Sequence, residues 1–228
     1  MKSVLFLCLF VFIGPLFYGQ SSFSSGILPK VRVSYKLTDQ IKWINGIESR
    51  QLLIDDTNDD SFNYDYVLTD ISSLLSFRIG AHGVLNGGYL LRIKDEKLFH
   101  RTIQQYNLVF NYDTFRIGHR FATDQTFNSQ ESVELRGRYR ITLEKPLSGN
   151  NIDQGEFYLK LGNEYIFKFQ DDKSDLEMRV LPFLGYEINT KNKIEIGLDY
   201  RLDKLLNSGA ENDLWLSINW FYTIKRGE

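Results

Sequence analysis

Polar and apolar residues alternate along most of this chain, and the longest clean alternation runs from residue 131 to residue 147. One face of this stretch carries Ser132, Glu134, Arg136, Arg138, Arg140, Thr142 and Glu144. The other face carries Val133, Leu135, Gly137, Tyr139, Ile141 and Leu143. Because successive side chains of a strand point to opposite faces, the pattern predicts a strand with one charged wall and one apolar wall. A soluble sandwich would bury the apolar wall, whereas an outer-membrane barrel would turn it to lipid and keep the charges in its lumen.

Ten further stretches of the chain alternate in a similar way and are predicted as strands. They cover residues 28–37, 41–53, 63–80, 84–93, 102–112, 115–127, 156–169, 176–189, 193–206 and 213–224. Turn-forming residues separate them, for example the polar run 55–61 and the dipeptide 113–114. The position of one hairpin turn stays open, because both 81–83 and 86–88 carry the glycine that such a turn favours.

The number and length of the predicted strands favour a closed barrel. Segments of about ten or more residues suit a barrel better than a sandwich, whose strands average about 5 to 6 residues. The fold class is therefore all-β, an antiparallel transmembrane β-barrel of about 10 to 12 strands. Single-chain bacterial barrels usually have an even number of strands, so we expect ten or twelve, with one error near the N-terminus or within 63–93. Pro182 falls inside a predicted strand, and we expect a bulge there because a closed barrel has no free edge to receive a proline.

The N-terminus has the pattern of a cleavable signal peptide. Met1 and Lys2 precede an apolar run over 3–17, and Gly19 offers a small residue at which cleavage can occur. The run is shorter than the roughly 20 residues of a membrane-spanning helix. We therefore predict a signal peptide over residues 1–19 and a single barrel domain over 20–228. The only cysteine, Cys8, lies in the signal, so the mature chain would have no disulfide and no thiol chemistry.

The charge balance excludes one large class of partner. The chain carries 27 Lys and Arg against 29 Asp and Glu, a formal net charge of -2, and the arginines are interleaved with carboxylates. Nucleic-acid binding depends on clustered, uncompensated positive charge, so no nucleic-acid partner is expected.

Several short motifs in the second half of the chain resemble those of a known family. They are Gly118-His119-Arg120, the run 136–140 with Glu144 and Pro146-Leu147, the run 156–159 with Glu164, and Arg179 followed by Gly185-Tyr186. With them, the whole mature chain resembles an uncharacterised family of Bacteroidota-type outer-membrane barrels, domain of unknown function number twenty-four ninety. The resemblance implies a location in the Gram-negative outer membrane, with membrane lipid and the barrel assembly machinery as partners. It implies little about activity.

The sequence offers no clear catalytic centre. Barrel-borne lipid hydrolases and acyltransferases need a nucleophile beside a base, and the bases present here are His82, His100 and His119. None lies in a serine–histidine pattern, and no set of residues has the spacing of a metal site. We therefore expect no catalytic residues, no metal and no cofactor. A barrel-borne hydrolase or acyltransferase and a secreted ligand-binding β-sandwich stay as the alternatives.

The candidate functional residues are the charges predicted to face the lumen. They are Arg120, Glu134, Arg136, Arg138, Arg140, Glu144, Glu164, Glu177, Arg179, Glu195 and Arg201. Opposite charges on neighbouring strands favour pairing, so the preferred interpretation is a structural lattice of ion pairs inside a porin-like barrel. The second interpretation is a narrow pore or ligand pocket for small anionic solutes, since charged rings select ions in channels. A barrel of this size lies between the filled 8-stranded barrels and the open 16- to 18-stranded porins, so the sequence leaves both open.

Overall fold

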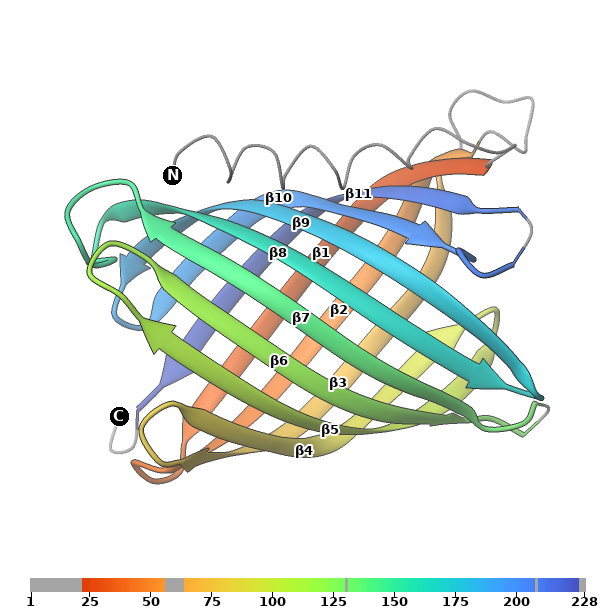
Figure 1. Cartoon of the computed structure of the whole chain (residues 1–228), viewed down its shortest axis with the longest axis horizontal. Helices are drawn as coiled ribbons and strands as arrows, with labels where there is room; N and C mark the ends of the chain where they lie inside the picture. The colour runs from red at the N-terminus through yellow and green to blue at the C-terminus, as the bar shows by residue number, and fades with distance from the viewer. Residues whose placement is uncertain (1–21, 56–63, 130, 208, 226–228) are drawn as a thin grey trace.

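The computed structural model describes residues 22–55, 64–129, 131–207 and 209–225, and in them the chain forms eleven strands (Figure 1). The strands are β1 (Ser22–Lys36), β2 (Ile41–Asp55), β3 (Asp65–Ile79), β4 (Gly83–Lys94), β5 (Lys97–Asn111), β6 (Arg116–Phe127), β7 (Glu134–Pro146), β8 (Glu156–Gln170), β9 (Lys173–Asn189), β10 (Asn192–Asp203) and β11 (Glu211–Ile224). Each predicted strand corresponds to one of them. Within these ranges, no helix is long and apolar enough to cross a membrane. The predicted signal peptide, 1–19, lies outside the described residues.

The eleven strands form one closed barrel. Strands that follow one another in sequence pair in antiparallel fashion, and β1 then pairs with β11 in parallel, from Ser22 beside Glu211 to Tyr35 beside Ile224. The expectation of an even number of strands is therefore wrong. A last strand can close a sheet in either direction, because its backbone donors and acceptors pair in parallel as well as antiparallel ladders. The two-sheet sandwich is also wrong, since the single sheet closes on itself and leaves no edge.

The hairpin turn between β3 and β4 lies at 80–82, the first of the two positions that the sequence allowed. The alternative run, 86–88, lies within β4. A glycine is required at Gly88, because a Cβ there would lie 2.2 Å from the carbonyl oxygen of Ser73. A Cβ at Gly87 would meet nothing within 4 Å. Gly88 thus serves the close approach of two strands, and neither glycine forms the turn.

Pro182 does not sit at a bulge, so that prediction is wrong. In the β9–β10 ladder Phe183 pairs with Gly197 and Val180 with Tyr200, so the register is the same on both sides of the proline. On the other side, Pro182 stays in register with Leu161 of β8. The proline therefore interrupts the ladder on one side without an inserted residue. Gly197, the partner of Phe183, allows the close approach, because a Cβ there would lie 2.1 Å from the carbonyl oxygen of Pro182.

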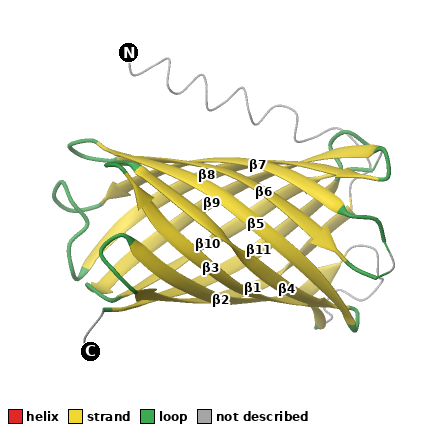
Figure 2. Ribbon diagram, turned by 90° about the horizontal axis from the view of Figure 1, so that it is seen from below, coloured by secondary structure: helices red, strands yellow, loops and turns green. Residues whose placement is uncertain are grey.

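The two faces of the barrel wall have opposite chemistry. Large apolar side chains point outward and are exposed, as at Leu161, Ile196 and Leu216. Charged side chains point inward and are buried, and Asp124 and Glu164 have no exposed surface at all. Figure 2 shows the strands crossing the barrel obliquely. Alternate residues of each strand face the lumen, because successive side chains of a strand point to opposite faces. This distribution is the reverse of that in a soluble protein.

Candidate functional site

All eleven candidate residues lie on the inner side of the barrel wall. Lining a central cavity are Arg120, Arg136, Arg138, Arg140, Arg179, Glu195 and Arg201. Glu134 and Glu144 line two further cavities, one toward each end of the barrel. Glu164 and Glu177 are buried in the wall beside the arginines with which they pair.

Glu164 of β8 holds three arginines from three strands. Arg140, directly across on β7, donates from Nη2 to Oε2 at 2.6 Å. Arg120 of β6 donates to the other carboxylate oxygen, and Nη1 of Arg179 on β9 lies 4.0 Å from Oε2. Because the carboxylate is fully buried, these contacts are made away from water, where charge-assisted bonds are strong.

Asp124 of β6 forms a second centre of the same kind. Nε of Arg136 donates to Oδ1 at 2.5 Å, Nη2 of Arg138 lies 2.7 Å from Oδ2, and Nε of Arg101 lies 3.7 Å from Oδ1. Arg101 also donates to Thr126 at 2.8 Å. Asp124 and Arg101 were not among the predicted site residues. The signal for Asp124 was present, because alternation in 115–127 places it on the same face as Arg120.

The other predicted residues form smaller groups, some along one strand and some between strands. Arg179 and Arg201 each bind a carboxylate two residues earlier on their own strand, Glu177 at 2.5 Å and Asp199 at 2.7 Å. Glu195 accepts bonds from Tyr158 at 2.8 Å and from Lys160 at 2.9 Å. Two further pairs join Glu134 to Arg136, at 3.5 Å, and Glu144 to Arg116. The lattice therefore combines contacts along strands with contacts between them.

The wall formed by β1 to β4 carries a third group of ion pairs. Glu48 binds Lys30 at 2.6 Å and Arg50 at 3.3 Å. Asp70 accepts two bonds from Arg92, both at 2.8 Å. None of these residues was among the predicted site residues. For Glu48 and Arg50 the reason is the less regular alternation in β2, where the register with β3 shifts between residues 50 and 51.

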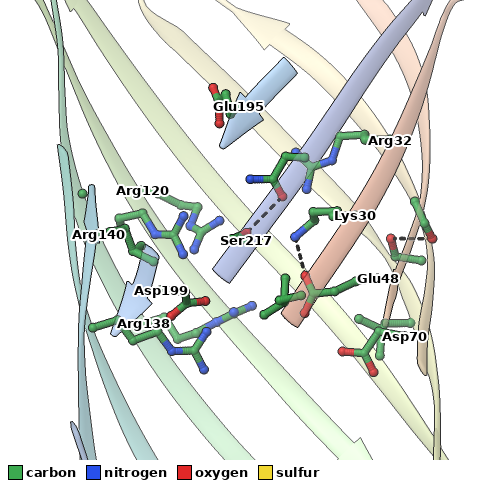
Figure 3. Close-up of a pocket in the computed structure, with 18 of the residues that line it drawn as sticks. Lys30, Arg32, Glu48, Asp70, Arg120, Arg138, Arg140, Glu195, Asp199 and Ser217 are labelled. Atoms are coloured by element: carbon green, nitrogen blue, oxygen red, sulfur yellow. Dashed lines mark hydrogen bonds and ion pairs between the residues drawn. The ribbon is translucent and has the colours of Figure 1, made fainter. Parts of the chain in front are cut away.

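The central cavity has a volume of about 250 Å³ and lies between these charged walls (Figure 3). Figure 3 places Arg120, Arg138 and Arg140 on one side of it and Lys30 and Arg32 on the other. The end cavities have volumes of about 190 and 310 Å³. A hydrogen bond from Tyr158, which lines an end cavity, to Glu195, which lines the central one, lies between the two.

The three histidines contact backbone or aromatic partners. His82 Nδ1 lies 3.1 Å from the carbonyl oxygen of Val109, and His119 Nδ1 lies 3.0 Å from the hydroxyl of Tyr139. His100 contacts the hydroxyl of Tyr89. Across the described ranges, no group of three or more His, Cys, Asp or Glu residues is placed to hold a metal ion.

The closed sheet, its apolar outer face and its buried salt bridges define a single-chain β-barrel protein with a charged lumen. A family model described as Protein of unknown function (DUF2490) matches residues 26–212, and the chain belongs to this family. The resemblance found from the motifs is confirmed. No curated protein and no solved structure matches the chain.

Proposed function

We propose that this protein is a β-barrel of the Gram-negative outer membrane whose lumen is filled mainly by a structural lattice of ion pairs. The observation that carries the proposal is the exposed apolar outer face. β8 alone turns Phe157, Leu159, Leu161, Phe167 and Phe169 outward, each 42 to 51% exposed. Soluble proteins rarely expose contiguous apolar patches larger than a few hundred Å², whereas a lipid-facing barrel wall requires them.

Aromatic side chains near one end of the barrel support the same placement. Tyr35 packs against Trp43 beside the β1–β2 turn, with ring centroids 5.8 Å apart. Trp220 packs against Tyr222 near the end of β11, at 6.1 Å. Tyrosine and tryptophan concentrate at membrane–water interfaces because one part of each ring system is apolar and another part forms hydrogen bonds.

A closed lattice is favoured over an open passage by the burial of its acidic groups. Glu164, Asp124 and Glu195 have at most 1% of their surface exposed, and each binds at least two cations. Side chains so fully enclosed fill space that an open channel would need for water. A narrow pore for small solutes is the alternative function of the same lumen.

The proposed role is non-enzymatic, with outer-membrane lipid and the barrel assembly machinery as partners. The histidine contacts described above support it, because a hydrolase or acyltransferase would use such a base to activate a nucleophile. Purified protein should give no lipid turnover above that of a His119→Ala variant. Turnover that this variant loses would establish the enzyme instead.

Fractionation and gel migration test the membrane placement. The protein should remain with outer membranes after carbonate extraction and should migrate faster before boiling than after it, as folded barrels do. Recovery in the soluble periplasm without a migration shift would overturn the placement.

Conductance across a planar bilayer tests the lattice against the pore. Folded wild-type protein should give no conductance steps, and the pair Arg138→Ala with Glu144→Ala should create them by removing side chains from the lumen. Discrete steps from the wild-type protein would instead support a passage.

A further inference from the structure

The central cavity has more positive charge than its carboxylates can balance. Twelve Lys and Arg residues line it, and the ion pairs found in the described parts of the chain join eleven of them to eight carboxylates. Four positive charges are therefore in excess around one enclosed space. Two of the carboxylates, Glu177 and Glu195, also bind lysines outside the cavity lining, so the local compensation is weaker still.

Like charges are also placed directly opposite one another. Arg120 and Arg140 are cross-strand partners in the β6–β7 ladder, and Arg179 and Arg201 are partners in the β9–β10 ladder. Such pairs repel when nothing lies between them. Only one carboxylate, Glu164, stands in the row that joins Arg140 on β7 to Arg179 on β9. Three of these guanidinium groups, those of Arg120, Arg140 and Arg179, share Glu164, whereas Arg201 binds Asp199.

Arg32 is the clearest uncompensated charge. No hydrogen bond or ion pair reaches it from any residue that the structure describes, and its guanidinium lies 5.8 Å from the ring centre of Phe221. It lies near Lys30 on its own strand; Glu48 and Glu195 attract it without binding it directly, and Arg140 from the opposite wall repels it. Its guanidinium is therefore the one cation of the cavity lining that no described carboxylate binds directly.

Donor groups around the same cavity also lack acceptors. Buried guanidinium nitrogens without a hydrogen-bond partner occur on five arginines that line it, namely Arg50, Arg120, Arg136, Arg138 and Arg140. Buried donors in proteins are almost always paired, so the arginines of this lining carry more donors than the described side chains accept from. The excess charge and the unpartnered donors are separate features of the lining, and both favour an anionic ligand.

We propose that the central cavity binds a small multivalent oxyanion, of the class of inorganic phosphate or the phosphate group of a small solute. Guanidinium groups bind such oxyanions through paired, charge-assisted hydrogen bonds, which a chloride ion cannot match. The volume of about 250 Å³ is below the range of about 300 to 1,000 Å³ of drug-sized pockets, so the ligand must be small. The proposal goes beyond the structural lattice, and it does not depend on where the barrel resides.

Calorimetric titration of the folded, full-length mature chain in detergent micelles tests it. Inorganic phosphate is titrated at constant ionic strength, with chloride as the balancing anion. Saturable binding of one phosphate per barrel is expected, together with a rise in unfolding temperature that chloride does not produce. Absence of saturable binding, or equal stabilisation by phosphate and chloride, would overturn the proposal.

Arg32→Gln and Arg78→Gln form a matched pair of variants. Arg32 binds no carboxylate directly, so its replacement leaves no carboxylate without its ion-pair partner. Phosphate binding should weaken by about tenfold, which is the effect of one lost charge-assisted hydrogen bond. Arg78 is exposed at the end of β3, and its replacement removes the same charge outside the cavity, so affinity should change less than about twofold. Equal weakening in both variants would show a response to net charge and refute the site. If Arg32→Gln does not fold, the contrast between phosphate and chloride on the wild-type protein decides alone.

Discussion

Replacing Glu164 with glutamine tests how much the lattice stabilises the barrel. The substitution keeps the size of the side chain but removes the charge to which Arg120 and Arg140 donate and beside which Arg179 lies. Removing one partner of a buried ion pair leaves the other charge uncompensated and costs about 3 to 5 kcal/mol. Glu164 has no exposed surface, so solvent cannot screen this loss.

The predicted loss is large enough to measure by thermal unfolding. For a chain of this length, 1 kcal/mol corresponds to about 2 to 4 °C, so Glu164→Gln should lower the unfolding temperature by roughly 6 to 20 °C. The assay follows the shift in gel migration with temperature in detergent. Glu131→Gln is the matched control, because Glu131 is exposed between β6 and β7 and should change stability by less than about 0.5 kcal/mol.

A double variant separates the loss of the pair from the loss of the carboxylate. Adding Arg140→Gln to Glu164→Gln removes one of the stranded charges and should restore part of the stability, because the two residues interact directly. Equal unfolding temperatures for Glu164→Gln, Glu131→Gln and wild type would refute the idea that the buried carboxylate holds the lumen together.

Three further outcomes are expected. Gly88→Ala should destabilise the barrel by about 1 to 3 kcal/mol in thermal unfolding, because its Cβ would overlap the β3 backbone. Gly87→Ala should leave the stability unchanged, and similar effects of the two substitutions would argue against the close approach of the strands at Gly88. Asp124→Asn should lower the unfolding temperature to an extent comparable with Glu164→Gln, since Arg136 and Arg138 lose their shared carboxylate, and an unchanged temperature would contradict this. With the proposed outer-membrane placement, single cysteines in a Cys8-free mature chain, Ser22→Cys and Lys225→Cys, should react from opposite sides of the membrane, since the paired strands β1 and β11 run parallel and the start of β1 and the end of β11 lie at opposite ends of the barrel. Labelling of both from outside intact cells would refute the parallel closure.

Much of the fold follows from local alternation, because that pattern depends only on neighbours in sequence. The stretch 131–147 identified the strand that became β7, with Arg136, Arg138 and Arg140 inward and Leu135 and Ile141 outward. Alternation says nothing about how the first strand meets the last. The prediction of an even number of strands was therefore wrong, although the eleven alternating segments each became a strand.

Which charged residues bind each other in the lumen could be predicted less well than which side of the barrel wall each residue faces. Asp124 binds Arg136 because β6 and β7 pair in a register that places them opposite each other, and register depends on turn geometry and long-range packing. The group around Glu48 and Asp70 lies on strands where a register shift disturbs the alternation. Sequence reasoning selected charges from the regular half of the chain and passed over those in the irregular half.

The parallel pairing of β1 with β11 means that the other ten strands have the directions of an all-antiparallel barrel. Because β2 is antiparallel to β1, and β1 is parallel to β11, removing β1 would leave β2 and β11 correctly oriented to close an even, ten-stranded sheet. Strand direction alone therefore does not require β1 for closure, although in this barrel β1 joins β11 to β2. It carries Lys30 and Arg32, two of the cations that face the central cavity, so the supernumerary strand brings positive charge into the lumen as well as widening it.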